Sequence, residues 1–232
     1  ANETFAADLV HELKSPIAAV RACTEALERP VDPARAARLA RALTESTDRL
    51  DALVSQFLEI ARAEAGLPHE ERAALDLAAL VRGLAGALAA EERHAHVRFD
   101  IEAEPVDAVA AAGPLESALR NILENAASFA GEGGWVRARV RREGAAAVVE
   151  ITDSGPGIAP ASLPRVFDRF FTDRRENKGT GLGLAHAKAV VEAHGGTLAA
   201  TSEPGHGATF VVHLPASVSP SAPVSPPAPA SV

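Results

Sequence analysis

Methionine is absent from the 232-residue sequence, and cysteine occurs once, as Cys23. A single cysteine cannot form an internal disulfide or a multi-cysteine metal site, so a disulfide-stabilised scaffold is excluded. No apolar run approaches the roughly 20 residues that a membrane-spanning helix requires, and the N-terminus lacks the basic, apolar and small-residue order of a signal peptide. We therefore expect the chain to be soluble. Because position 1 is not methionine, we also expect it to be a fragment of a longer chain.

Positive charge is also scarce. The chain has 23 Lys and Arg residues against 31 Asp and Glu residues, which gives a formal net charge of -8. A chain with this balance has no broad electrostatic attraction to nucleic acid or to anionic lipid. We therefore expect no nucleic-acid partner and no membrane contact by this fragment. The length allows one large domain or two modest ones.

Glycine is missing before Gly66, and residues 1–66 have a helical pattern. Apolar residues step by four and three, which is the spacing of a seam between packed helices. The seam residues are Leu13, Ile17, Val20 and Leu27, followed by Leu39, Leu43, Leu50, Leu53, Phe57 and Ile60. Residues 29–33 interrupt the pattern with two prolines, and Asp32 can cap a helix that opens at Pro33. The sequence predicts a helical hairpin over 1–66, two copies of which would pair into a four-helix bundle.

The segment 67–215 mixes helical patterns with strand patterns. Asp76 can cap a helix over 77–90, and the alternation over 97–102 is typical of a half-buried strand. Further strands are predicted near 106–110, 135–141, 146–152, 196–201 and 207–214, with helices over 113–130 and 181–194. This mixture predicts the α+β class. Residues 216–232 consist of Pro, Ser, Ala and Val without a charge, and we expect them to be disordered.

A six-residue run, HELKSP, begins at His11. At roughly 100° per residue, Leu9 and Leu13 lie about 200° from His11, so the imidazole is predicted to face solvent. A neutral imidazole nitrogen is a competent nucleophile near pH 7. Glu12 could orient the ring through one nitrogen, and Ser15, one turn further on, could orient a water. A solvated histidine on an amphipathic helix is the alternative, and these residues alone leave it open.

Two further motifs suit a nucleotide. Asn121 and Asn125 share one helix face, so both carboxamide oxygens could reach the same hard cation. Asp153 follows a predicted strand, where its carboxylate could accept a hydrogen bond from an adenine amino group. Gly155 and Gly157, directly after it, would permit close backbone approach or a positive φ.

A second glycine-rich run, GTGLG over 179–183, opens a predicted helix. Its free N–H groups and the positive helix end could bind a phosphate chain. Arg174, Arg175 and Lys178 suit a lid that meets phosphate oxygens. Each motif has a neutral alternative, because asparagine pairs, Asp-Ser-Gly turns and lone GxGxG runs are common. The prediction rests on their order and combination.

With these motifs assembled, residues 3–215 resemble the cytoplasmic catalytic core of a two-component sensor histidine kinase. The matching segments are 11–16 for the phosphoacceptor box, 121–125 for the N box, 153–157 and 179–183 for the two glycine boxes, and 167–171 for the F box. The resemblance implies a dimerising hairpin followed by an ATP-binding α/β sandwich of the type shared with DNA gyrase and some chaperone ATPases.

The resemblance also implies residue roles. His11 would accept the γ-phosphoryl group of Mg-ATP, with Glu12 orienting the ring, and pass it to an aspartate of a response-regulator receiver domain. Ser15 would keep reverse phosphatase chemistry open. Asn121 and Asn125 would bind Mg²⁺ and phosphate. The remaining cofactor residues would be Phe129, Asp153, Gly155, Gly157, Ile158, Arg174, Lys178, Gly179, Thr180, Gly181, Leu182 and Gly183.

Three positions depart from the family pattern. Ser128 stands where a Lys or Arg is usual, so one phosphate contact would be missing or supplied by Arg174 or Lys178. Ser15 stands where many relatives have Thr or Asn. Residues 172–177 differ from the common continuation of the F box. A dimeric signalling scaffold that binds ATP poorly is therefore a second hypothesis.

A third hypothesis is an ATPase motor that uses Glu124 as its water-activating base. Like other members of the resembled family, the fragment would lie in a bacterial cytoplasm, with the full-length protein tethered to a membrane. His94 and His96 are predicted to share one strand face as surface histidines, and Cys23 and Trp135 to be packing residues. The remaining histidines have no recognisable partner pattern: His69, His186, His194, His206 and His213.

Overall fold

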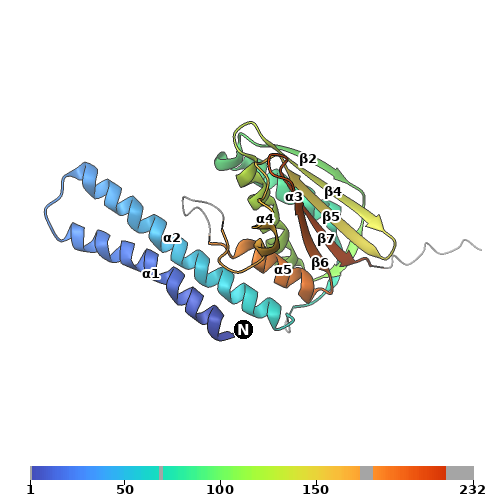
Figure 1. Cartoon of the computed structure of the whole chain (residues 1–232), viewed down its shortest axis with the longest axis horizontal. Coiled ribbons are helices and arrows are strands. Elements are labelled where there is room, and N and C mark those ends of the chain that lie inside the picture. Colours follow the sequence, from blue (N-terminus) through green and yellow to red (C-terminus); the bar gives the residue numbers. More distant parts are fainter. Residues whose placement is uncertain (1, 68–69, 173–179, 218–232) are drawn as a thin grey trace, which may run out of the picture.

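Two long helices project from a mixed α/β layer (Figure 1). The computed structural model describes residues 2–67, 70–172 and 180–217, and the side chains of residues 2–8 and of His11 lie outside the described part. The predicted disordered tail therefore lies outside it from residue 218 onward. A helical hairpin followed by an α/β layer confirms the predicted α+β class.

The hairpin consists of α1 (Asn2–Leu27) and α2 (Pro33–Glu64), and its turn forms as the sequence predicts. Asp32 has an extended backbone, and its side chain accepts a hydrogen bond from the N–H of Arg35 at 2.9 Å. Pro33 then starts α2, where its missing N–H leaves no helical hydrogen bond unmade. The two prolines and the cap together reverse the chain.

The predicted seam is only partly correct. Ile17 and Leu27 of α1 are 53% and 39% exposed in the single chain. Leu53 and Ile60 of α2 are buried, but in a cluster that includes residues of α5 (Gly183–Ala193) as well as of α1. The apolar repeat of α2 therefore reflects contact with the α/β layer in addition to contact with α1.

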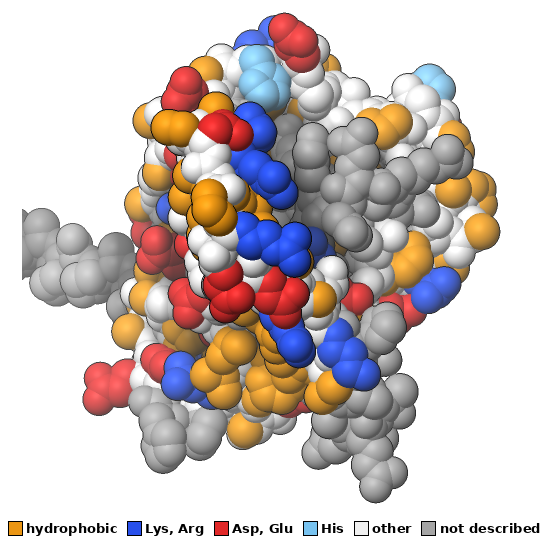
Figure 2. Space-filling model, turned by 90° about the vertical axis from the view of Figure 1, so that its left-hand side faces the viewer, with side chains coloured by type: hydrophobic (Ala, Val, Ile, Leu, Met, Phe, Trp, Pro, Cys, Tyr) orange, Lys and Arg blue, Asp and Glu red, His pale blue; other side chains and the backbone are white. Residues whose placement is uncertain are grey.

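Apolar side chains also remain on the surface of the hairpin. Val10 and Ile17 of α1 and Val54 and Leu58 of α2 are each about half exposed. Figure 2, which views the molecule from the left of Figure 1, shows hydrophobic side chains mixed with charged ones on this side. Uncovered apolar surface of this kind is typical of a face that meets another protein.

The α/β layer is a five-stranded sheet whose helices cover one face. In order across the sheet, the strands are β2 (Arg98–Ala103), β4 (Trp135–Glu143), β5 (Ala146–Asp153), β7 (Ala208–Pro215) and β6 (Thr197–Ser202). β2 pairs parallel with β4, and the other neighbours are antiparallel. The covering helices are α3 (Leu77–Ala90), α4 (Ala112–Ala130) and α5. Figure 1 places α4 and α5 between the sheet and α2.

Two short elements differ from the sequence prediction. A strand that was not predicted, β1 (Ala73–Asp76), pairs antiparallel with β3 (Asp107–Ala110). The prediction that His94 and His96 share a strand face is wrong, because the chain forms the 3₁₀ helix η1 (Glu92–His94) there. His94 is buried, whereas His96 is exposed. A second 3₁₀ helix, η2 (Leu163–Arg165), follows β5.

Helix α4 carries the two asparagines that the sequence analysis assigns to a nucleotide motif. Its apolar side chains recur every three or four residues, and Leu115, Leu119 and Ile122 are fully buried against the sheet. Asn121 and Asn125 flank this apolar stripe and are half-buried. The packing of the stripe therefore fixes the direction in which the two carboxamides point.

Capping of α3 provides a test of the fold. Asp76 Oδ1 accepts hydrogen bonds from the N–H groups of Ala78 and Ala79 at 2.8 and 3.0 Å, as the sequence predicts. We expect Asp76→Ala to lower the free energy of unfolding of the α/β layer by about 1 kcal/mol. The measurement is urea unfolding followed by fluorescence of Trp135, the only tryptophan, which lies on β4. Asp76→Asn keeps the acceptor and should retain the parent midpoint; equal midpoints for all three proteins would contradict the capping role.

Candidate functional site

A cavity of about 780 Å³ lies where α4, the end of β5 and the start of α5 meet. Its volume is in the range of roughly 300–1,000 Å³ that is usual for small-molecule sites. Gln56 of α2 and Arg93 of η1 contribute to its rim. The fold thus brings together three motifs that are far apart in the sequence.

The asparagine pair lines this cavity from α4. Asn121 Nδ2 lies 2.8 Å from Nδ1 of His186, a buried residue of α5. A Cβ built on Gly183 would lie 3.7 Å from Asn121 Oδ1, so the start of α5 closely approaches the carboxamide oxygen. Carboxamide oxygens are ligands that suit Mg²⁺, which usually combines few protein ligands with phosphate oxygens. The pair of Asn121 and Asn125 fits such a site.

Asp153 ends β5 and is 2% exposed. Its Oδ1 accepts a hydrogen bond from the N–H of Gly155 at 2.8 Å. Burial raises the pKa of Asp153, and hydrogen bonds from the backbone N–H groups of Gly155 and Ala208 oppose this rise. Phe129 and Ile158 add apolar wall to the cavity that Asp153 lines. A buried acceptor beside apolar walls suits a planar base that carries an amino group.

The turn after β5 requires its glycines. Gly157 lines the cavity with φ +74°, and a Cβ there would lie 2.2 Å from the carbonyl oxygen of Glu203. Gly155 is not among the lining residues. It is packed against the end of α4, where a Cβ would lie 2.6 Å from the carbonyl oxygen of Phe129. Gly155 therefore acts on the site through backbone packing and through its N–H to Asp153.

The start of α5 lines the cavity through Thr180, Gly181 and Gly183. Gly181 has φ +68°, and a Cβ there would lie 2.5 Å from the carbonyl carbon of Phe170. The side chain of Leu182 does not line the cavity, because it is fully buried in the cluster between α2 and α5. The unsatisfied N–H groups of the first helical turn provide an anion-binding end.

The residues predicted for phosphotransfer lie on α1. His11 belongs to the helix, but its side chain lies outside the described part, so its exposure stays a prediction. Glu12 Oε2 lies 3.8 Å from Nη2 of Arg49 on α2, and Ser15 is exposed. Four residues predicted for the lid or the pocket lie outside the described residues: Arg174, Arg175, Lys178 and Gly179.

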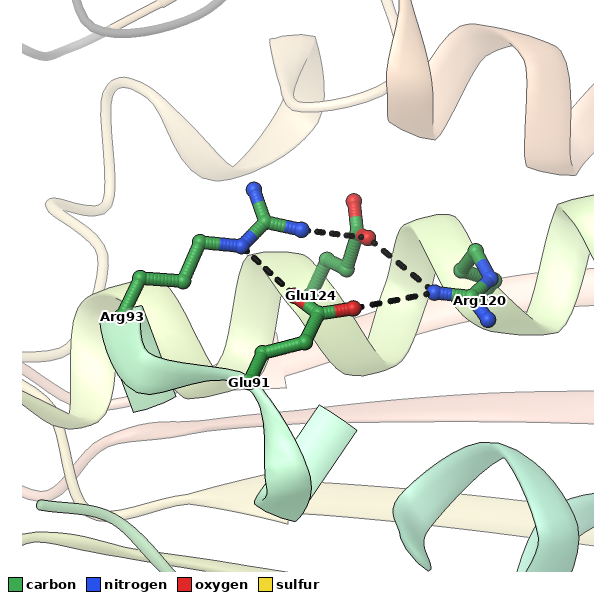
Figure 3. A network of polar contacts seen from close by, with 4 residues as sticks. All are labelled: Glu91, Arg93, Arg120 and Glu124. Carbon is green, nitrogen blue, oxygen red and sulfur yellow. Dashed lines mark hydrogen bonds and ion pairs between the residues drawn. The ribbon is translucent and has the colours of Figure 1, made fainter. Parts of the chain in front are cut away.

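Four charged residues form a network (Figure 3), and two of them, Arg93 and Glu124, line the cavity. Arg93 donates to Glu124 Oε1 at 3.0 Å and to Glu91 Oε2 at 2.7 Å. Arg120 Nη1 lies 3.4 Å from Glu91 Oε1 and 3.6 Å from Glu124 Oε1. The hydrogen bond from Arg93 lowers the pKa of Glu91. Both guanidinium groups engage the same oxygen of Glu124, and the hypothesis of an ATPase that uses Glu124 as its base stays a prediction.

Three residues of the site were not predicted. Gln56 Oε1 accepts a hydrogen bond from Thr180 Oγ1 at 2.5 Å. Arg93 is the only Lys or Arg among the described residues that line the cavity. His186 contacts Asn121, although its sequence neighbours indicate no partner. No local pattern could identify these residues, because their partners come from distant elements.

Two family models match the chain. Residues 1–66 match the His Kinase A (phospho-acceptor) domain, and residues 111–218 match the histidine kinase-, DNA gyrase B- and HSP90-like ATPase. Among solved structures, the mycobacterial sensor histidine kinase MprB is 30% identical, with a TM-score of 0.57, over 62% of this chain and 97% of that chain. The chain belongs to the two-component sensor histidine kinases.

Curated sensor kinases are similar over most of the chain. Sensor protein ChvG of Agrobacterium fabrum is 32% identical and covers 92% of this chain, which in turn covers 39% of ChvG. Sensor-like histidine kinase SenX3 of Mycobacterium tuberculosis is 33% identical, and the match covers 93% of this chain and 54% of SenX3. The chain thus spans about half or less of the length of these relatives. The structure of histidine kinase ThkA in complex with response regulator protein TrrA has the same fold, with 22% identity and a TM-score of 0.74 over 92% of this chain and 61% of that chain.

The family match confirms the resemblance found in the sequence and gives the chain the ATP-binding module of an ATP-dependent histidine kinase. The roles of individual residues stay predictions. Within the described ranges, no helix combines the length and the apolar character needed to cross a membrane.

Burial of Asp153 generates a prediction about pH. Because its pKa is raised in the folded state, the native protein binds this proton more tightly than the unfolded chain does. Protonation of Asp153 stabilises the folded protein fully at pH values below the pKa that this group has in the unfolded chain. This stabilisation is lost as the pH rises through the pKa that Asp153 has in the folded protein. We therefore expect Asp153→Asn to be at least as stable as the parent at pH 7, and this difference to narrow as the pH falls.

The measurement is urea unfolding of the parent and of Asp153→Asn at pH 7 and at successively lower pH values. Glu132→Gln, at an exposed position just after α4, is the matched control for the loss of one carboxylate. A parent protein that is more stable than Asp153→Asn at pH 7, with the gap closing on acidification, would show that the carboxylate is stabilising and would contradict the prediction.

Proposed function

We propose that this chain phosphorylates its own His11 from Mg-ATP and passes the phosphoryl group to an aspartate of a response regulator. In this proposal, residues 1–66 are the dimerising phosphotransfer hairpin and residues 67–215 the ATP-binding catalytic domain. The observation that carries the proposal is the single cavity in which Asn121, Asp153 and Gly181 meet. It lies beside a hairpin that bears the HELKSP run.

The cavity residues divide between the parts of the nucleotide. Asp153 would accept the hydrogen bond of the adenine amino group, with Phe129 and Ile158 against the base. Asn121 and Asn125 would hold Mg²⁺, which neutralises charge on the phosphates when bound. The backbone around the site would be supplied by Gly155, Gly157, Gly179, Thr180, Gly181, Leu182 and Gly183, and phosphate contacts would come from Arg174 and Lys178.

His11 would supply the nucleophile. A lone pair of its neutral ring attacks the γ-phosphorus, a P–N bond forms, and the bond from that phosphorus to the β–γ bridging oxygen breaks as ADP leaves. Glu12 would hold the ring in the required tautomer; Arg49 contacts its Oε2, which leaves Oε1 for the ring. In the second transfer, the P–N bond breaks as an aspartate oxygen takes the phosphoryl group.

The proposed partners follow from the hairpin surface. ThkA, which shares the fold, has been solved in complex with its response regulator, and we propose a receiver domain as the partner here too. The exposed Ser15 could orient a water for a reverse phosphatase reaction. Exposed Val10, Ile17, Val54 and Leu58 support pairing of two hairpins in a four-helix bundle. The family supports a bacterial cytoplasmic location, with a membrane tether elsewhere in the full-length protein.

The proposal is tested by incubation with γ-labelled ATP and magnesium. We expect label that is stable to base and labile to acid, and its complete loss in His11→Gln, because the proposal makes His11 the acceptor of the phosphoryl group. Circular dichroism and nucleotide binding of His11→Gln should match the parent. Label that survives the substitution would refute the assignment, and parent protein that binds no nucleotide would favour the scaffold hypothesis.

Arg93 is proposed to supply the cation that Ser128 does not. Both residues line the cavity, and Arg93 is held there by Glu91 and Glu124. A lost charge-assisted hydrogen bond weakens binding by roughly tenfold, so we expect Arg93→Ala to lower the affinity for Mg-ATP by about that factor while leaving adenosine affinity unchanged. Calorimetry of both ligands provides the measurement.

Two further variants give this prediction its controls. Arg98→Ala removes an exposed arginine that pairs with Asp100 outside the cavity, and it should bind Mg-ATP as the parent does. Ser128→Lys, added to Arg93→Ala, should restore part of the lost affinity because it returns a cation to the same wall. Equal losses for ATP and adenosine in Arg93→Ala would show that the arginine supports the pocket shape and does not contact phosphate.

A further inference from the structure

His186 connects the hairpin to the cavity through two polar contacts. The residue lies on α5 and is 1% exposed. Its Nδ1 lies 2.8 Å from Nδ2 of Asn121 on α4, and its Nε2 lies 3.3 Å from Oε2 of Glu59 on α2. Ser117 Oγ, on α4, lies 3.4 Å from the same carboxylate oxygen. One buried ring therefore bridges three helices.

The identity of the two partners determines where the ring proton lies. The carboxylate of Glu59 can only accept, so it favours a hydrogen on Nε2 of His186. A ring with its hydrogen on Nε2 presents a bare lone pair at Nδ1. The matching partner for that lone pair is an N–H of the Asn121 carboxamide.

This contact fixes which end of the Asn121 carboxamide faces the cavity. With Nδ2 held by His186, Oδ1 is the atom left for a cation. A histidine with the opposite tautomer would present an N–H at Nδ1 and favour the flipped amide, which would direct Nδ2 and its hydrogens toward the cation site. An N–H group cannot ligate a cation.

We propose that His186 is a positioning residue that orients the Asn121 carboxamide for Mg²⁺, and that Glu59 of the hairpin holds His186 in the required tautomer. This inference rests on the proposed function, since it assigns Mg²⁺ to Asn121 and Asn125. It extends that function by making the metal site depend on α2. The Asn121 oxygen is held in place only while α5 lies against α2 and Glu59 reaches the ring.

The effect of the contact between Glu59 and His186 can be distinguished from the effect of packing α2 against the α/β layer. Glu64 of α2 also pairs with the α/β layer, through Arg169, but does not contact His186. Glu64→Ala is therefore a matched control for Glu59→Ala, because both remove one α2 carboxylate that faces the layer. Glu59→Gln keeps an oxygen acceptor for Nε2–H and is the conservative variant.

The experiment uses the full chain and titrates Mg²⁺ at a fixed concentration of a non-hydrolysable ATP analogue. Loss of a residue that holds a metal ligand through a hydrogen bond typically lowers metal affinity by about 10- to 100-fold. We therefore expect Glu59→Ala to raise the half-saturating Mg²⁺ concentration about tenfold. Adenosine affinity, which needs no metal, should stay unchanged. Glu59→Gln and Glu64→Ala should remain within about twofold of the parent, since both leave the tautomer intact.

A second readout observes the tautomer directly. Nitrogen-15 NMR of the histidine ring should show hydrogen on Nε2 of His186 in the parent and a mixture of tautomers in Glu59→Ala, with resonances assigned through His186→Leu. Hydrogen on Nδ1 in the parent would overturn the proposal. An equal rise in the Mg²⁺ requirement for Glu59→Ala and Glu64→Ala would overturn it too, because the effect would then be loss of docking.

Failure of the proposed function would look different. If the parent bound no nucleotide, or if label survived in His11→Gln, the kinase assignment would fail whatever tautomer the ring adopted. If labelling depended on His11 and the Mg²⁺ requirement were unchanged in Glu59→Ala, the kinase assignment would stand and the positioning role would be wrong.

Discussion

The packing of α5 on α2 is the contact on which the candidate site depends. Leu53 and Ile60 of α2 meet Leu182 and Ala185 at the start of α5, and all four side chains are buried. Each large apolar side chain buried in this way contributes about 1.5–3 kcal/mol. Leu182 directly precedes the first residue of α5, so its burial determines where the free N–H groups of that helix point. The same contact brings Gln56 to the rim of the cavity.

This arrangement links the two halves of the molecule energetically. Gln56 of α2 lines the cavity and accepts a hydrogen bond from Thr180, so a ligand that bound the docked arrangement better would also favour docking of the layer. The shift that a ligand can cause equals its difference in affinity for the docked and undocked arrangements. The hairpin therefore contributes Gln56 to the candidate site as well as carrying His11.

Buried polar groups provide the specificity of the interior. Asp153 is satisfied by backbone N–H groups, and His186 by Asn121 and Glu59. His194 accepts a hydrogen bond from the N–H of Ala111 at 2.9 Å, which fixes the end of α5 to the start of α4. Burying such groups is costly unless each finds a partner, so these contacts favour one packing of the helices over the alternatives.

Local sequence determined much of this protein. Helical periodicity, the caps at Asp32 and Asp76, and alternation in the strands all depend on neighbours within a few residues, and the order of the motifs was sufficient to identify the family. Only the tertiary structure decided that His94 is buried in η1, and that His186 and His194 have partners. Contacts between residues far apart in the chain leave no periodic signal. For the same reason the apolar repeat on α2 could not show that Leu53 and Ile60 pack against the start of α5. An apolar stripe on a helix indicates that the stripe is buried, but it does not indicate which element buries it.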